Sequence, residues 1–236
     1  MYSNVICIGD SYTNEVQQLS QFNSEFKKVG YEFKSYPQLL GEHYNCKWET
    51  FGEPGTPMVF TLQILIDKIP YILSLENPLV IYQFGFFTNM ILHIEDDKWV
   101  NWKSSISSDK SASQHFQTET KYGVVCKSGV GLSDLKDKTL LIDYTKKFGE
   151  QTNYFIIQYF CTISDILSKL GKSNVYGMFF PQPNFEIPKA LKIIPFNNDL
   201  CAPSIKDILP QIDDNHKSTE ANQKVCDWIV NNIQKY

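Results

Sequence analysis

Short apolar runs alternate along the chain with longer segments in which apolar residues recur at helical spacing. A short run bounded by turn residues predicts a buried strand, and a repeat of three to four residues over a longer segment predicts a helix. Because the two alternate, we expect one α/β domain over residues 1–236, a three-layer α/β/α sandwich with a central, mostly parallel sheet of about five strands. The predicted strands are 4–9, 47–51, 78–85, 174–180 and 190–195, and the predicted helices are 35–44, 58–75, 140–170 and 219–234.

Residues near the predicted helix ends support these boundaries. Ser35 is expected to be an N-cap, with Pro37 in the first turn behind it, and Ser218 is expected to cap the last helix. Pro70 lies inside a helical pattern and should kink or divide that helix, because proline has no N–H to donate.

Residues 90–137 lack any clear periodicity and are rich in Ser, Lys, Asp and Gly. A stretch of this length inside a compact domain is typical of a lid or binding insertion. It could equally contain a small β-hairpin around residues 122–127. Trp99 and Trp102 lie within it, and they would either stack on a sugar ring or pack inside the lid.

The charge composition argues against nucleic acid as a partner. The formal net charge is −4, and all 22 basic residues are lysine, because the sequence contains no arginine. Phosphate contacts need clustered cations, and bidentate guanidinium clamps are not available to this chain. The absence of arginine, with abundant Asn, Lys, Ile and Phe, is typical of an AT-rich genome such as that of a virus or a parasite.

The six cysteines are far apart and form no C-x-x-C pair, so we expect no structural metal site. The chain begins directly with a predicted strand, without the basic and apolar regions of a leader peptide, and no run approaches the length of a membrane span. We therefore expect reduced thiols, a cytoplasmic location and no membrane partner. The oligomeric state is left open.

The strand over residues 4–9 ends at Gly9-Asp10-Ser11, which places a serine where the chain leaves the sheet. In a parallel sheet the active site lies at the carboxyl ends of the strands. A nucleophilic serine needs a base, a group that orients the base, and donors for the oxyanion. His216 is a candidate base because Asp213 precedes it by three residues. The alternative is a solvated loop in which Asp213 and Asp214 merely cap a turn.

Three blocks follow one another along the chain: Gly9-Asp10-Ser11-Tyr12-Thr13, Thr50-Phe51-Gly52-Glu53-Pro54-Gly55 and Asp213-x-x-His216. Together they resemble the motifs of the SGNH/GDSL hydrolases, in order and in spacing, from one end of the chain to the other apart from the insertion at 90–137. The resemblance implies the flavodoxin-like three-layer fold of that superfamily and ester hydrolysis. It implies that Ser11 is the nucleophile, His216 the general base and Asp213 its orienting group. The N–H groups of Ser11 and Gly55 would form part of the oxyanion hole.

The third block of that family, Gly-x-Asn, is altered here. After the strand that ends at Gly85, strict spacing puts Phe87 at the asparagine position, and Asn89 comes two residues late. Either a longer turn lets Asn89 complete the oxyanion hole, or Asn89 is a helix N-cap and the third donor is missing. Thr50 also stands where the family more often has Asn, which should affect the bracing of the loop.

We therefore expect a serine esterase that hydrolyses a small acyl ester, for instance an O-acetyl group on a glycan, without a metal or an organic cofactor. Two alternatives stay open. The chain could be a binding or structural module with weak or no hydrolase activity, which the phenylalanine in the third block favours. It could also transfer the acyl group to an acceptor other than water.

Overall fold

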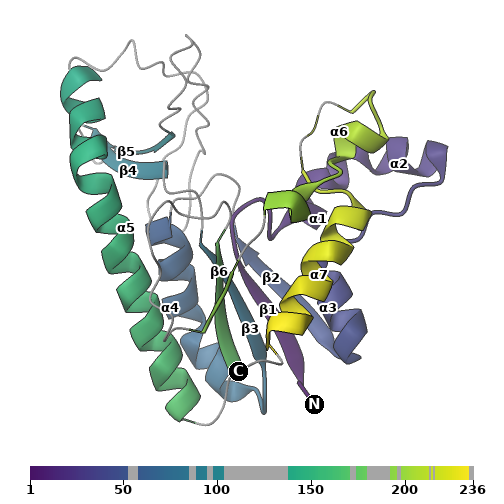
Figure 1. Ribbon diagram of the computed structural model, residues 1–236, viewed down its shortest axis with the longest axis horizontal. Coiled ribbons are helices and arrows are strands. Elements are labelled where there is room, and N and C mark those ends of the chain that lie inside the picture. Colours follow the sequence, from purple (N-terminus) through teal and green to yellow (C-terminus); the bar gives the residue numbers. More distant parts are fainter. Residues whose placement is uncertain are drawn as a thin grey trace.

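The computed structural model shows a central sheet with helices on both faces (Figure 1). It describes residues 1–236 except 53–57, 85–88, 95–97, 104–137, 171–173, 180–191, 196–197, 213, 215 and 234–236. It describes the backbone but not the side chains of 17–18, 59–60, 89–94, 98–103, 138–153 and 198.

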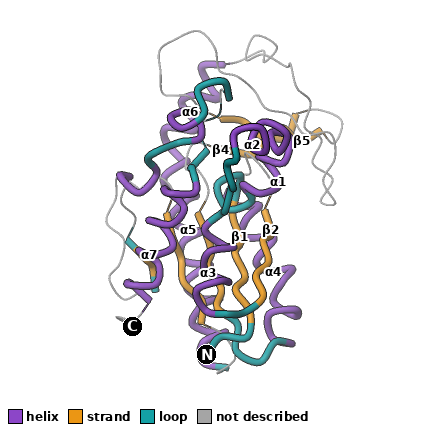
Figure 2. Tube along the Cα trace, turned by 90° about the vertical axis from the view of Figure 1, so that its right-hand side faces the viewer, coloured by secondary structure: helices purple, strands orange, loops and turns teal. Residues whose placement is uncertain are grey.

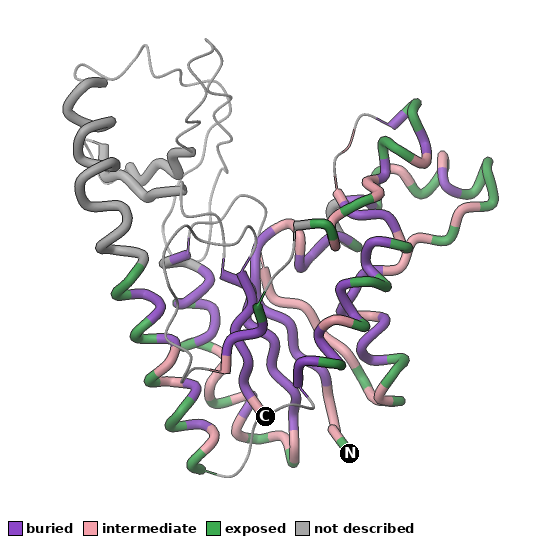
Figure 3. The backbone as a smooth tube through the Cα atoms, viewed as in Figure 1, coloured by how far each residue is buried: buried purple, intermediate pink, exposed green. Residues whose placement is uncertain are grey.

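The central sheet has five strands, all parallel, in the order β2-β1-β3-β6-β7. The three inner strands are almost entirely buried (Figure 3), as expected for a parallel sheet that is covered on both faces. The predicted number and direction of the strands are confirmed. Their bounds are β1 Asn4–Gly9, β2 Lys47–Gly52, β3 Leu79–Phe84, β6 Asn174–Phe179 and β7 Ile193–Ile194.

Alternate residues of the strands point into two separate cores. Val5 and Cys7 of β1 pack with α3 (Tyr36–Tyr44) and α7 (Thr219–Ile233). Ile6 and Ile8 of the same strand pack with helices on the other face, α4 (Met58–Ser74) and α5 (Lys138–Lys169). This alternation, which is the two-residue period of a strand, produces the predicted three layers.

The strand order creates a switch point between β1 and β3. From β1 the chain first adds β2 on one side and then β3 on the other. Ligands of open α/β sheets bind in the crevice beyond the carboxyl ends of the strands, at such a point. Ser11 comes two residues after the end of β1, so it lies at the carboxyl end of this strand, beside the switch point.

A small lobe lies beyond the carboxyl ends of β1 and β2. Figures 1 and 2 both show α1, α2 and α6 gathered there. Its apolar centre contains Leu19, Phe26 and Ile205, which join the segment after Ser11 to the segment before α7. The bounds of these elements are α1 Glu15–Leu19, η1 Ser20–Phe22, α2 Asn23–Val29, η3 Asn198–Cys201 and α6 Ile205–Ile208.

The predicted helix caps are confirmed in position, with one difference in chemistry. The Ser218 hydroxyl accepts a hydrogen bond from Ala221 N at 3.2 Å, as an N-cap should. Ser35 occupies the N-cap of α3, but its hydroxyl is buried without a partner in the part of the chain that the structure describes. The Asn222 side chain accepts from Tyr36 N at 3.0 Å instead, so α7 caps α3. Helix α4 continues through Pro70 to its end and is not divided.

The insertion differs from the expected aperiodic segment. Strands β4 (Asn89–Ile94) and β5 (Lys98–Lys103) pair antiparallel, as a two-stranded sheet separate from the central one. Asn89 is the first residue of β4, so the helix N-cap interpretation is wrong. Cross-strand pairing is a non-local property, which the mixed apolar and polar pattern of these residues did not reveal. The hairpin expected at 122–127 lies outside the described residues.

Among the helices that the structure describes, none combines the length and the apolar character needed to cross a bilayer.

Candidate active site

Two glycines let the end of β1 approach its neighbours closely. A Cβ on Gly9 would overlap the Thr13 hydroxyl and come within 2.5 Å of the Gln83 side-chain oxygen. A Cβ on Gly52, at the end of β2, would overlap the Gly9 carbonyl oxygen. The loop that carries Ser11 therefore folds tightly over the ends of β1 and β3, which requires glycine at these positions.

The buried side chain of Asp10 fixes the position of this loop. Its side chain is completely buried, and Oδ1 accepts hydrogen bonds from Tyr12 N at 2.9 Å and from Gln83 Nε2 at 2.8 Å. Its other oxygen, Oδ2, is buried without a partner among the described residues. Burial raises the pKa of Asp10, and the hydrogen bonds and the nearby charges of Lys217 and His216 offset only part of this effect.

A chain of buried hydrogen bonds continues beneath the loop. The Thr13 hydroxyl contacts both the Gln83 side-chain oxygen and the Tyr36 hydroxyl, the latter at 2.9 Å. Gln83 is thus held between Asp10 and Thr13, so β3 is tied to the loop after β1. These buried hydrogen bonds fix the relative positions of the groups that they join.

Ser11 is half-buried and lies in the chain between Asp10 and Tyr12, which belong to this network. Neither its hydroxyl nor its backbone N–H forms a hydrogen bond with another described residue. Its two neighbours, Asp10 and Tyr12, are joined by the hydrogen bond that Tyr12 N donates to the buried Asp10 side chain. The hydroxyl and the N–H of Ser11 are therefore not engaged by other described residues, while the next residue is held.

His216 lies beside the same loop, with one ring nitrogen bound. Its Nδ1 is 2.6 Å from Asp214 Oδ1, and its backbone N donates to the same oxygen at 2.8 Å. Both side chains are mostly buried, 17% and 16% exposed, so Asp214 and His216 are shielded from solvent. Burial alone would raise the pKa of Asp214, but the hydrogen bonds from His216 outweigh it and leave that pKa below its ordinary value.

The second ring nitrogen of His216 is unpaired. With the Nδ1 proton directed at a carboxylate, a neutral imidazole carries its lone pair on Nε2. This Nε2 is buried and has no hydrogen-bond partner within the described part of the chain, so no hydrogen bond joins it to Ser11. The imidazole packs against the ring of Tyr12, the residue after Ser11, with ring centroids 5.2 Å apart.

The carboxylate at His216 comes one residue later than the predicted one. Asp213 lies outside the described residues, and Asp214 occupies the position at Nδ1. The reason is local. An aspartate commonly accepts from the backbone N–H two residues ahead in an Asx-turn, and here the same oxygen also reaches the ring. The Asp-x-His spacing could have suggested this arrangement from the sequence.

A buried ion pair beside the site was missed by sequence reasoning. Lys217 Nζ lies 2.7 Å from Glu15 Oε1, and both side chains are completely buried. The two residues are separated by 201 intervening positions, so no local pattern indicates their contact.

The remaining predicted site residues are only partly visible. Gly55 lies outside the described residues, and the side chains of Asn89, Trp99 and Trp102 are likewise outside what is described. Thr50 does brace the loop, because its hydroxyl donates to Asn14 Oδ1 at 3.1 Å. Asn14 Nδ2 donates in turn to the Gly52 carbonyl at 3.1 Å, which ties the end of β2 to the segment after Ser11.

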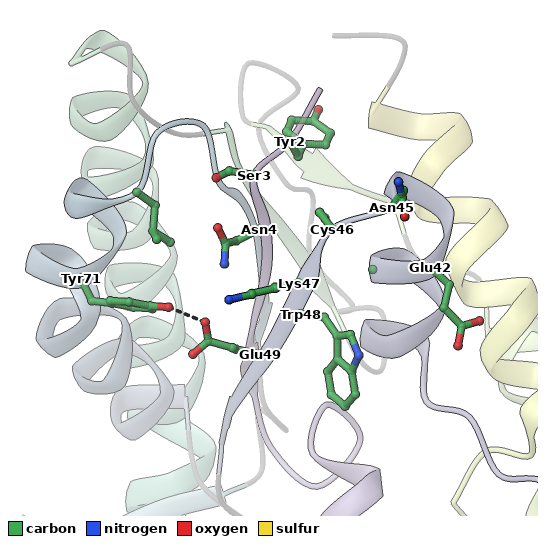
Figure 4. A pocket seen from close by; sticks show the side chains of 12 residues that line it. Tyr2, Ser3, Asn4, Glu42, Asn45, Cys46, Lys47, Trp48, Glu49 and Tyr71 are labelled. Atoms are coloured by element: carbon green, nitrogen blue, oxygen red, sulfur yellow. Dashed lines mark hydrogen bonds between the residues drawn. The ribbon is translucent and has the colours of Figure 1, made fainter.

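A surface hollow of about 910 Å³ lies at the opposite end of the sheet, near the starts of β1 and β2 (Figure 4). Tyr71 donates a hydrogen bond to Glu49 at its margin. Neither Ser11 nor His216 lines it, so it is separate from the candidate site.

Within the described residues, no group of three or more His, Cys, Asp or Glu side chains is placed to hold a metal ion.

A comparison of the sequence with models of known protein families and with curated proteins finds no match to either.

Proposed function

We propose that the protein is a serine hydrolase that acts on carboxylic esters, with Ser11 as nucleophile and His216 as general base. The observation that carries the proposal is the state of His216. Its Nδ1 is fixed by a carboxylate, its Nε2 is unpaired, and its ring lies against the residue that follows Ser11. A base that is oriented by a carboxylate and has a free Nε2 is one of the components that acyl transfer by serine requires.

In the proposed reaction, Ser11 Oγ attacks the ester carbonyl while His216 Nε2 takes the hydroxyl proton. Asp214 stabilises the imidazolium that forms and keeps the ring in the correct tautomer. The Ser11 N–H donates to the oxyanion, and the resemblance to SGNH hydrolases adds the Gly55 N–H and the Asn89 amide as further donors. The imidazolium then protonates the leaving alcohol. Water, activated by the same Nε2, releases the acid from the acyl-enzyme.

The proposed substrate class is a small acyl ester, for instance an O-acetyl group on a glycan. It rests on the resemblance to the SGNH superfamily and on Trp99 and Trp102 in the insertion, whose faces suit a sugar ring. Those two tryptophans belong to β5, in the antiparallel hairpin that follows β3 along the chain.

Initial rates of para-nitrophenyl acetate hydrolysis test the proposal. Ser11→Ala and His216→Gln should each lower kcat to near background. Ser24→Ala and His43→Gln are matched controls, since Ser24 bonds only its exposed neighbour Glu25 and His43 packs against Tyr44 on α3, and both should keep the wild-type rate. Turnover that survives in Ser11→Ala overturns the assignment of the nucleophile.

A second candidate, a binding module with this fold and no hydrolase activity, is favoured by one observation. No hydrogen bond links Ser11 to His216 Nε2 in the structure. Catalytic hydrogen bonds are often long in unliganded enzymes and tighten with substrate, so the observation does not decide against the esterase. Wild-type protein that shows no turnover of activated esters across pH 6–9 would favour the module.

A further inference from the structure

The buried ion pair between Glu15 and Lys217 joins the two halves of the candidate site. Glu15 begins α1, four residues after Ser11, and Lys217 follows His216 directly. Lys217 Nζ is 2.7 Å from Glu15 Oε1, and the Lys217 backbone N donates to the same oxygen at 3.1 Å. One carboxylate oxygen therefore binds both the side chain and the backbone of the residue next to the base.

Lys217 also holds the residue next to the nucleophile. Its ammonium donates to the Tyr12 carbonyl at 3.1 Å and lies 4.7 Å from the centroid of the Tyr12 ring. The Tyr12 N–H is bound by Asp10, so both peptide groups of Tyr12 are fixed, one from the end of β1 and one from Lys217. The Tyr12 ring also lies against the His216 imidazole, with ring centroids 5.2 Å apart.

Stability is a poor explanation for this pair. Removing two charges from water is expensive, and their attraction offsets that expense only when the remaining oxygens and protons are also bound. Glu15 Oε2 is buried with no partner among the described residues. Apolar residues of similar size often stabilise a fold as well as or better than a buried pair.

The backbone around His216 is already held without the pair. Ile205 N donates to the His216 carbonyl at 2.8 Å, Ser218 N donates to the Pro203 carbonyl at 3.0 Å, and the two segments form an isolated bridge. These bonds fix the His216 segment to the turn before α6. The ion pair adds a link of a different kind, from that segment to the loop that carries Ser11.

We propose that Glu15 and Lys217 are positioning residues that set His216 Nε2 against Ser11, an inference that rests on the proposed hydrolase function. They act by connecting the segment that follows Ser11 to the residue that follows His216. Neither group takes part in proton transfer, because the Lys217 ammonium is bound to Glu15 and Tyr12 and both side chains are completely buried.

The double variant Glu15→Gln/Lys217→Met removes both charges, and the Gln oxygen can still accept from the backbone N at 217. We expect it to unfold near the wild-type midpoint, with kcat lowered by about 10–100-fold and KM changed by less than about threefold, since small misplacements of catalytic groups act mainly on the chemical step. Ile72→Ala, which truncates a fully buried residue of α4, controls for general destabilisation and should keep kcat. A double variant that folds and keeps wild-type kcat overturns the proposal.

A second variant covers the case in which the double variant does not fold. Glu15→Asp keeps both charges but withdraws the carboxylate by one methylene. It should fold and lose kcat in the same direction, and it overturns the proposal if kcat is unchanged.

An NMR measurement separates this inference from the proposed function. The wild type should show a nuclear Overhauser effect between the rings of Tyr12 and His216, and the double variant should lose it. If the wild type has no Ser11-dependent turnover, the proposed function fails. The positioning role of Glu15 and Lys217 is then tested by the contact between Tyr12 and His216 alone. A folded double variant that keeps the nuclear Overhauser effect between Tyr12 and His216 would contradict this positioning role even then.

Discussion

Asp214 Oδ1 lies 2.6 Å from His216 Nδ1, two residues away along the chain, and accepts from the His216 backbone N as well. One carboxylate oxygen thus fixes both the ring and the backbone of the proposed base. The neighbouring aspartate, Asp213, is the one expected from the family motif, which makes the two residues a matched pair for mutation.

Asp214→Asn should lower kcat by about 10³–10⁴-fold, because an amide at Nδ1 favours the wrong tautomer of the imidazole. Asp213→Asn should stay within a few fold of wild type. The measurement is kcat/KM for an activated ester at neutral pH. If Asp213→Asn shows the large loss and Asp214→Asn does not, the contact at Nδ1 is not the one used in catalysis.

Asp10 should contribute a stability that falls as pH rises, which is the opposite of what a carboxyl group with a lowered pKa contributes. Burial raises the pKa of Asp10 above its ordinary 3.8, so the folded state binds this proton more tightly than the unfolded chain does. The stability of wild type relative to Asp10→Asn is therefore greatest below about pH 3.8 and falls as pH rises through the raised pKa. Each unit of pKa shift corresponds to about 1.4 kcal/mol. Urea unfolding at a series of pH values measures the difference.

Asp207 supplies the opposite control. Hydrogen bonds from the Ser204 backbone N and hydroxyl hold the pKa of Asp207 below its ordinary 3.8. Its contribution is present above that value and is lost as pH falls, so the stability of wild type relative to Asp207→Asn should rise with pH. Parallel slopes for the two variants would contradict the assignment of Asp10 as a carboxyl that burial raises.

Gly9→Ala should damage both the fold and the site. The added methyl overlaps the Thr13 hydroxyl and crowds Gln83, so we expect a loss of about 1–3 kcal/mol in the free energy of unfolding and a fall in kcat. Gly30→Ala is the comparison, because Gly30 has φ +69° and nothing within 4 Å of its Cβ position. It should lose only about 1 kcal/mol through backbone strain and keep full activity. Equal kcat in the two variants would show that the tight approach at Gly9 does not position Ser11.

The central fold could be read from the sequence because its signals are local. Buried strands such as β1 and β3 are short apolar runs, and α5 repeats its apolar residues over many turns. The Ser218 cap depends only on the residue at the helix start. The separate β4–β5 hairpin was not predicted, because its pairing depends on cross-strand contacts rather than on a clear alternation.

The candidate site was only partly predictable for the same reason. Ser11 and His216 are candidates from motifs, and the structure places the His216 ring against Tyr12, the residue after Ser11. The Glu15–Lys217 pair joins residues at opposite ends of the chain and was invisible in the sequence. The contact of Asp214 with His216 follows from an Asx-turn, in which the carboxylate accepts from the N–H two residues ahead.

The most direct test of a nucleophilic Ser11 served by His216 is intact-protein mass spectrometry after exposure to a fluorophosphonate. The account predicts a single covalent adduct that maps to Ser11, with a labelling rate about 10²–10⁴-fold lower in His216→Gln. A wild-type protein that stays unlabelled, or an adduct of the same mass in Ser11→Ala, would contradict it.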